Sequence, residues 1–182
     1  MKIAIILGST RPTRISPTLG TWIADALRGH GLDVEIIDLI QVDLPFLNEP
    51  EQPSLHLYRN ESTKRWSEIV SQYDGFILLS AQYNWGYPEV LKNALDTLYD
   101  EWRGKPVSVV TYGGHGGFQA ALALGLVLRG LRMRTLATNP QITIHDDIDR
   151  DAEGKLTDVD RMMKPYETAF ANVAQEFLTL QS

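Results

Sequence analysis

Residues 75–96 read GFILLSAQYNWGYPEVLKNALD, and this stretch decides the fold. Its opening, residues 75–80, is an apolar run typical of a strand that is buried on both faces. Its end, residues 88–96, begins with proline and has the apolar spacing of a helix. An aromatic loop that contains a glycine, residues 82–87, therefore lies where a buried strand gives way to a helix. In open parallel sheets, ligands bind at this carboxyl edge.

Two further loops have the same setting. Residues 8–16 and residues 113–117 each lie between an apolar run and a helical pattern. Because the carboxyl ends of parallel strands meet at one edge of a sheet, we expect the three loops to lie together. Three such loops predict a site for a flat, phosphorylated ligand.

Apolar runs alternate with helical patterns along the whole chain, which predicts an α/β fold of one domain over residues 1–182. Five parallel strands with right-handed crossovers favour a flavodoxin-like three-layer sandwich of strand order 2-1-3-4-5. The segment from Leu44 to Pro53 is too rich in proline for regular structure. The expected strands are 3–7, 34–39, 76–79, 107–112 and 133–137, the last continuing through 142–144, and the expected helices are 17–30, 61–73, 88–102, 118–131 and 159–180.

The composition excludes several classes of function. The chain has 182 residues, of which 43% are hydrophobic, and its formal net charge is −6, which argues against a nucleic-acid partner. It has no cysteine, so disulfides and thiolate catalysis are excluded, and any redox chemistry has to come from a bound cofactor. No apolar stretch approaches the ~20 residues of a membrane span. We therefore expect a cytoplasmic protein without membrane contact.

The loop at residues 8–16 has the chemistry of a phosphate site. It opens onto a helix whose free N–H groups attract anions, and Arg11 or Arg14 can pair with a phosphate dianion. The alternative is that Ser16 caps the helix and the arginines are solvated. The loop matches neither G-x-G-x-x-G nor G-x-x-x-x-G-K-[ST], which disfavours dinucleotide-fold and P-loop sites. The hydroxyl donors of the loop are Ser9, Thr10, Thr13 and Ser16.

The other two loops have features that suit a planar ring. Residues 82–87 offer backbone N–H groups, the amide of Asn84 and aromatic faces, and Gly86 permits close approach. The glycines of residues 113–117 and the following helix end are suited to stabilise negative charge on a ring. The alternative is that the glycines permit tight turns and the aromatics pack in the core.

Three motifs together resemble the NADPH-dependent FMN reductase family, and in particular its NAD(P)H:quinone reductase members. They are LGSTR at 7–11, QYNWGYP at 82–88 with LKNALD at 91–96, and YGGHGG at 112–117. The resemblance implies a flavodoxin-like fold, non-covalently bound FMN, NADPH or NADH as co-substrate, a small-molecule electron acceptor, and a homodimer or tetramer.

The resemblance also implies roles for particular residues. Ser9, Arg11 and Ser16 would hold the FMN phosphate, and Arg14 is an additional candidate because the end of this loop departs from the Ser-Phe-Asn of many members. Many members also have Pro-Glu where this chain has Ala81-Gln82. Gln82, Tyr83, Asn84 and Trp85 would border the ring and ribityl chain, and Gly113, Gly114 and His115 would lie near the pyrimidine end.

Three further features have competing interpretations. The wide apolar stripe of residues 88–102, which ends in Trp102, is expected to lie partly in the core and partly at a subunit interface. The acidic stretch 147–158 begins like a calcium loop, but Ala152 and Lys155 favour a solvated loop, and we expect no metal. His115 either hydrogen-bonds the flavin or donates a proton to a reduced acceptor, and a ligand contact is the favoured role.

The leading hypothesis is thus an FMN-dependent NAD(P)H oxidoreductase that reduces quinones, free flavin or similar acceptors. Two alternatives share the fold and cofactor. One is a flavodoxin-like electron carrier, which needs a partner reductase, and the other is a redox-sensing regulatory module.

Overall fold

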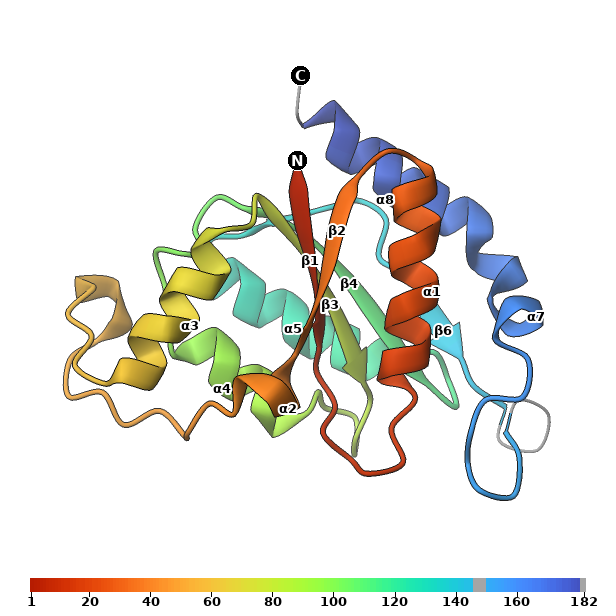
Figure 1. Ribbon diagram of the computed structural model, residues 1–182, viewed down its shortest axis with the longest axis horizontal. Coiled ribbons are helices and arrows are strands. Elements are labelled where there is room, and N and C mark those ends of the chain that lie inside the picture. The colour runs from red at the N-terminus through yellow and green to blue at the C-terminus, as the bar shows by residue number, and fades with distance from the viewer. Residues whose placement is uncertain (146–149, 181–182) are drawn as a thin grey trace.

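A parallel sheet forms the centre of the molecule, and helices cover both of its faces (Figure 1). The computed structural model describes residues 1–145 and 150–180. The strand order is β2-β1-β3-β4-β5, and β6 also pairs with β4. This order confirms the flavodoxin-like sheet. The strands are β1 (Lys2–Leu7), β2 (Asp33–Asp38), β3 (Gly75–Ala81), β4 (Pro106–Gly113), β5 (Arg134–Thr135) and β6 (Gln141–Thr143).

The expected fifth strand is in fact two short strands that pair with β4 one after the other. β5 pairs with the start of β4, and β6 pairs with its end. Pro140 precedes β6 and has no N–H to donate to a ladder, which interrupts the pairing. Between the two strands, the side-chain oxygen of Asn139 accepts the N–H of Val109 at 2.8 Å and so replaces a backbone acceptor.

The alternation of side chains along β1 sorts the helices into two layers. Ile3, Ile5 and Leu7 point into a core that includes residues of α1 (Ser16–Gly29), α7 (Val159–Met163) and α8 (Glu167–Thr179). Ala4 and Ile6 point into the opposite core. Figure 1 shows α1 and α8 side by side on one face. The opposite layer contains α3 (Glu61–Ser71), α4 (Glu89–Asp96) and α5 (Phe118–Gly130).

The helix expected over residues 88–102 ends at Asp96. The hydroxyl of Thr97 donates to the carbonyl of Asn93 at 2.7 Å, and the indole N–H of Trp102 donates to the carbonyl of Leu95 at 3.1 Å. The chain turns after α4, and Trp102 is fully buried against Phe76. Trp102 therefore belongs to the core, and the expectation that part of the stripe lies at a subunit face stays a prediction for its partly buried residues, such as Val90 and Tyr99.

Proline explains two further differences from the expected helices. The helix expected over 159–180 is interrupted at Lys164–Tyr166, because Pro165 has no N–H for an intrahelical bond. A short 3₁₀ turn, Pro53–Leu55, occurs in the proline-rich segment that was expected to be irregular. A short helix, α2 (Leu39–Val42), was not expected, and the carboxylate of Asp38 caps it by accepting the N–H of Ile40.

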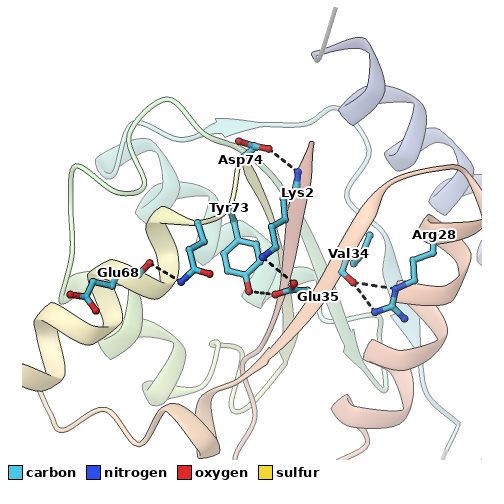
Figure 2. A network of polar contacts seen from close by, with 8 residues as sticks. Lys2, Arg28, Val34, Glu35, Glu68, Tyr73 and Asp74 are labelled. Carbon is cyan, nitrogen blue, oxygen red and sulfur yellow. Dashed lines mark hydrogen bonds and ion pairs between the residues drawn. The ribbon is translucent and has the colours of Figure 1, made fainter.

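Polar contacts fix the amino end of the sheet, opposite the three loops (Figure 2). The ammonium group of Lys2 lies 3.0 Å from the carboxylate of Glu35, which also accepts the hydroxyl of Tyr73 at 2.6 Å. The backbone N–H of Lys2 donates to Asp74, and Arg28 donates to the carbonyl of Val34. These contacts join β1, β2 and the residues just before β3 at the amino edge of the sheet.

No helix within residues 1–145 and 150–180 is long and apolar enough to cross a membrane.

Candidate functional site

The three loops predicted from the sequence meet at one cavity at the carboxyl edge of the sheet. The volume of the cavity is about 380 Å³, within the roughly 300–1,000 Å³ typical of small-molecule sites. It is bordered by the loop after β1, the ends of β3 and β4, and the segment after β6. The described residues that line it are Ser9, Arg11, Thr13, Arg14, Ile15, Ala81, Gln82, Tyr83, Tyr112, Gly113, Gly114, Ile144 and Arg150.

Ser9 connects the first loop to the second. Its side chain is fully buried, and its hydroxyl lies 2.5 Å from the hydroxyl of Tyr83. The preceding residue, Gly8, donates its N–H to the carbonyl of Leu79 in β3 at 2.9 Å. An added Cβ at Gly8 would lie 3.2 Å from that carbonyl oxygen. The glycine therefore permits the close approach that brings the two loops together.

Arg14 is held in place by Asp38, the last residue of β2. Two nitrogens of the Arg14 guanidinium donate to the two carboxylate oxygens of Asp38 at 2.6 and 2.5 Å, and one also donates to the carbonyl of Ser9 at 2.9 Å. Hydrogen bonds from Arg14 lower the pKa of Asp38, and those to Asp38 raise the pKa of Arg14. Arg14 lines the cavity, but Asp38 engages both of its terminal nitrogens. The main role of Arg14 is therefore to hold the loop of residues 8–16 in its conformation.

Replacing Asp38 with asparagine is expected to lower the free energy of unfolding by about 1–3 kcal/mol at pH 7, because it breaks charged hydrogen bonds. The pKa of Asp38 is lower in the folded chain than in the unfolded chain. Its contribution is therefore present above the unfolded pKa and is lost as pH falls through the folded value. We expect the difference between wild type and Asp38→Asn to be full at pH 7 and to shrink below about pH 4.

Urea unfolding at pH 7, 5 and 3 measures this difference. Asp25→Asn is a matched control, because Asp25 pairs with Arg28 where both side chains are about half exposed or more, and such pairs contribute roughly 0–1 kcal/mol. A difference for Asp38→Asn that stayed constant down to pH 3 would contradict the assigned ion pair.

Arg11 differs from Arg14 in being exposed. Its guanidinium carbon lies 5.8 Å from the centre of the Tyr83 ring, an arrangement in which a cation is attracted to the ring face. Arg11 lines the cavity with its charge at the solvent side. This position suits recognition of an anion that enters from solvent.

Two buried hydroxyl groups beside the cavity have no hydrogen-bond partner among the described residues. They belong to Ser16 and Tyr112, whose side chains are 0% and 5% exposed. The two oxygens lie near each other but do not reach hydrogen-bond geometry. Since buried hydroxyls are normally paired, they indicate that a polar ligand completes the site. The alternative role of Ser16 as a helix cap is wrong, because Ile15 occupies the cap position and no side chain caps the helix.

The loop after β3 is a tight two-residue hairpin. Tyr83 and Gly86 exchange backbone hydrogen bonds of 2.8 and 2.9 Å, and φ is +48° at Asn84 and +68° at Trp85, as in a type I′ turn. Tyr83 points its hydroxyl towards Ser9, whereas Asn84 and Trp85 form the exposed tip. The Trp85 side chain is 73% exposed. The structure thus brings Gln82 and Tyr83 to the cavity wall and leaves Asn84 and Trp85 outside it.

The loop after β4 also has some residues in the cavity wall and others outside it. Gly113 and Gly114 line the cavity, whereas His115 is exposed and is not part of the wall. Gln82 links this loop to the previous one, because its side-chain oxygen accepts the N–H of Ala120 in the first turn of α5 at 3.1 Å. One of the free N–H groups expected at this helix end is therefore already satisfied.

Three cavity residues were missed by reasoning from the sequence. Tyr112 ends an apolar run and was placed only in a strand and in the family motif. Its hydroxyl at the carboxyl end of a strand is the signal that could have identified it, because ligands bind at that edge. Ile144 and Arg150 lie after β6, and no local motif marks them. In the acidic stretch considered for calcium, Asp147 and Asp149 lie outside the described residues, while Asp151 accepts the N–H groups of Glu153 and Lys155.

Fold and site together define a flavodoxin-like protein with a cavity at the carboxyl edge of its sheet, lined in part by a loop that carries two arginines. Residues 1–146 match the family of NADPH-dependent FMN reductases. The chain belongs to the NADPH-dependent FMN reductase family, and it is an oxidoreductase. It is 43% identical to the NAD(P)H-dependent FMN reductase of Schizosaccharomyces pombe over 80% of this chain and 74% of that protein. It is 38% identical to the NAD(P)H-dependent FMN reductase of Saccharomyces cerevisiae over 75% and 78%.

Solved structures support the fold. The NAD(P)H:(acceptor) oxidoreductase FerB of Paracoccus denitrificans superposes with a TM-score of 0.70 at 24% identity, over 96% of this chain and 97% of that one. A flavodoxin of Pseudomonas aeruginosa superposes with a TM-score of 0.56 at 16% identity, over 97% and 98%. At these identities the similarity concerns the arrangement of the sheet and helices.

Proposed function

We propose that this chain is an FMN-dependent NAD(P)H oxidoreductase that reduces small-molecule acceptors. One observation carries the proposal: three loops far apart in the sequence converge on one cavity, which is lined by Tyr112. The buried hydroxyl of Tyr112 and that of Ser16, which follows the lining residue Ile15, lack partners among the described residues. Hydroxyl and guanidinium donors at the first loop fit a phosphate, and the glycine wall at the third loop fits a planar ring. The residues present therefore fit FMN.

The phosphate of FMN would be held by Ser9, Arg11 and Ser16, with Arg14 shaping the loop. Gln82, Tyr83, Gly113 and Gly114 would border its ring and ribityl chain. Asn84, Trp85 and His115 would act from the outer rim, where a second substrate approaches. The chemistry that FMN supplies when bound is acceptance of hydride from NAD(P)H and, in a second half-reaction, its delivery to an acceptor. The chain itself supplies position and shielding rather than a proton-transfer group in the cavity wall.

We propose quinones, free flavin, azo compounds and metal oxyanions as the acceptor class. The open cavity and the exposed loop tips at its rim favour a broad range of small molecules. An FMN-dependent NADPH-azoreductase of Staphylococcus saprophyticus is 30% identical over 80% of this chain, which supports including azo compounds.

We also propose a homodimer. Phe118, Leu122 and Leu126 recur every four residues on α5, and their side chains are 50%, 59% and 72% exposed. Such an apolar stripe on the surface is typical of a subunit interface. Sedimentation analysis is expected to give twice the chain mass of 20.5 kDa. A monomer at micromolar concentration would contradict the dimer while leaving the proposed activity in place.

A direct assay tests the proposed activity. Protein reconstituted with FMN is expected to oxidise NADPH or NADH rapidly when a quinone is added, without any partner protein. Steady-state rates with both nicotinamides and a panel of acceptors identify the substrates. A protein whose bound FMN is reduced only through a separate reductase would be an electron carrier, and a protein that takes up no FMN would contradict both readings.

A further inference from the structure

The cavity wall carries more positive charge than its first loop alone provides. Three arginines line it, Arg11 and Arg14 from the loop after β1 and Arg150 from the segment after β6, and no carboxylate is among the described lining residues. The charge of Arg14 is already neutralised by Asp38. A dianionic group in the cavity would therefore gain from a further cationic donor, and Arg150 lines the same cavity.

Arg150 is held by a compact turn. It forms an antiparallel bridge with Leu156, and its guanidinium donates to the carbonyl of Gly154 at 3.0 Å. The backbone N–H of Asp151 donates to the carbonyl of Lys155 at 2.9 Å. Leu156 packs against the core beneath α1 and α8. The turn thus anchors a cation at the cavity from a segment beyond residues 1–146, the part that matches the family.

The hydroxyl of Tyr112 belongs to the same cavity wall as Arg150. It is buried at the cavity and has no hydrogen-bond partner among the described residues, and the charge of Arg150 acts on it. Burial raises the pKa of Tyr112 to about 12, so the group is a protonated donor at neutral pH. The hydroxyls of Ser9 and Ser16 lie near the same oxygen. A phosphate bound by the serines would lie within the reach of both Tyr112 and Arg150.

We propose that Arg150 and Tyr112 are binding residues for the phosphate of FMN, so that the phosphate site includes donors beyond the first loop. This inference rests on the proposed function and deepens it. Arg150 supplies a charge-assisted hydrogen bond and Tyr112 a neutral one, both aimed at the same anionic group.

Comparing FMN with riboflavin tests the assignment, because riboflavin lacks the phosphate. Binding of each is followed by quenching of flavin fluorescence during titration with apoprotein. Arg150→Ala is expected to weaken FMN binding about 10- to 100-fold, since a hydrogen bond to a charged group is lost, and to leave riboflavin binding unchanged. Tyr112→Phe is expected to weaken FMN binding about 3- to 10-fold, again without changing riboflavin. Arg150→Lys keeps the positive charge, so it is expected to restore part of the affinity and to retain a salt dependence like that of wild type, whereas Arg150→Ala is expected to have a shallower one.

Lys155→Ala is the matched control, because Lys155 is an exposed cation in the same turn and does not line the cavity. It is expected to bind both flavins as wild type does. Equal losses for FMN and riboflavin in Arg150→Ala would overturn the inference, because they would indicate a damaged cavity. Unchanged FMN affinity in both Arg150→Ala and Arg150→Lys would also overturn it, while normal FMN binding by wild type would keep the proposed function intact. Failure of wild type to bind FMN would contradict the proposed function itself.

Discussion

Replacing Gly114 with valine is expected to weaken FMN binding by on the order of 100-fold while leaving the thermal unfolding midpoint unchanged. Gly114 lines the cavity, its φ lies outside the left-handed region, and a Cβ added there meets no atom within 4 Å. The folded chain therefore accepts a side chain at this position. The added methyl groups would occupy the space that the ring needs. The substitution would therefore destabilise the complex with FMN and leave the free protein as stable as before.

Gly29→Val is the matched control for this variant. Gly29 lies at the far end of α1, where an added Cβ also meets no atom within 4 Å. Binding is measured by flavin fluorescence and stability by differential scanning calorimetry. Wild-type affinity in Gly114→Val would mean that the ring does not lie against the third loop. A large fall in the unfolding midpoint would mean that the substitution damages the fold instead of the site.

Replacing Trp102 with alanine is expected to lower the free energy of unfolding by about 3–5 kcal/mol, the usual cost of removing a large aromatic side chain from a core. Trp102 is fully buried, with its ring 5.0 Å from that of Phe76 and 6.0 Å from that of Trp66. Its indole N–H also satisfies the carbonyl of Leu95 at the end of α4. The loss is expected to be independent of protein concentration, because the side chain packs within one chain.

Trp85→Ala makes the same chemical change at a side chain that is 73% exposed, and it is expected to alter stability by no more than about 0.5 kcal/mol. Urea unfolding at two protein concentrations compares both variants with wild type. A loss in Trp102→Ala that diminished at high protein concentration would point to a role in subunit contact and would contradict the packing described above.

The sheet and the position of the site were predictable because they depend on local patterns. The apolar runs of β1, β3 and β4 are long enough to identify buried strands, and each is followed by a loop with glycine or hydroxyl residues. Parallel connection then places those loops at one edge. For the same reason Ser9, Arg11, Arg14, Gln82, Tyr83, Gly113 and Gly114 were expected near the ligand, and the structure gathers all of them around one cavity.

The features that were missed depend on contacts between distant residues. The fork between Arg14 and Asp38 joins a loop to the end of a neighbouring strand, and neither residue predicts the other. The early end of α4 depends on the indole of Trp102 folding back onto Leu95. Arg150 lines the cavity together with residues of the first loop that are far from it in the sequence. Such pairings are set by tertiary packing, and local propensity carries no signal for them.

A crystal structure of the protein with FMN tests the central claim most directly. The phosphate is expected beside Ser9 and Ser16 at the start of α1, and the ring between the loop after β3 and the loop after β4. Density for FMN in another hollow, such as the one between β5 and α8, or with its phosphate away from the first loop, would contradict the account.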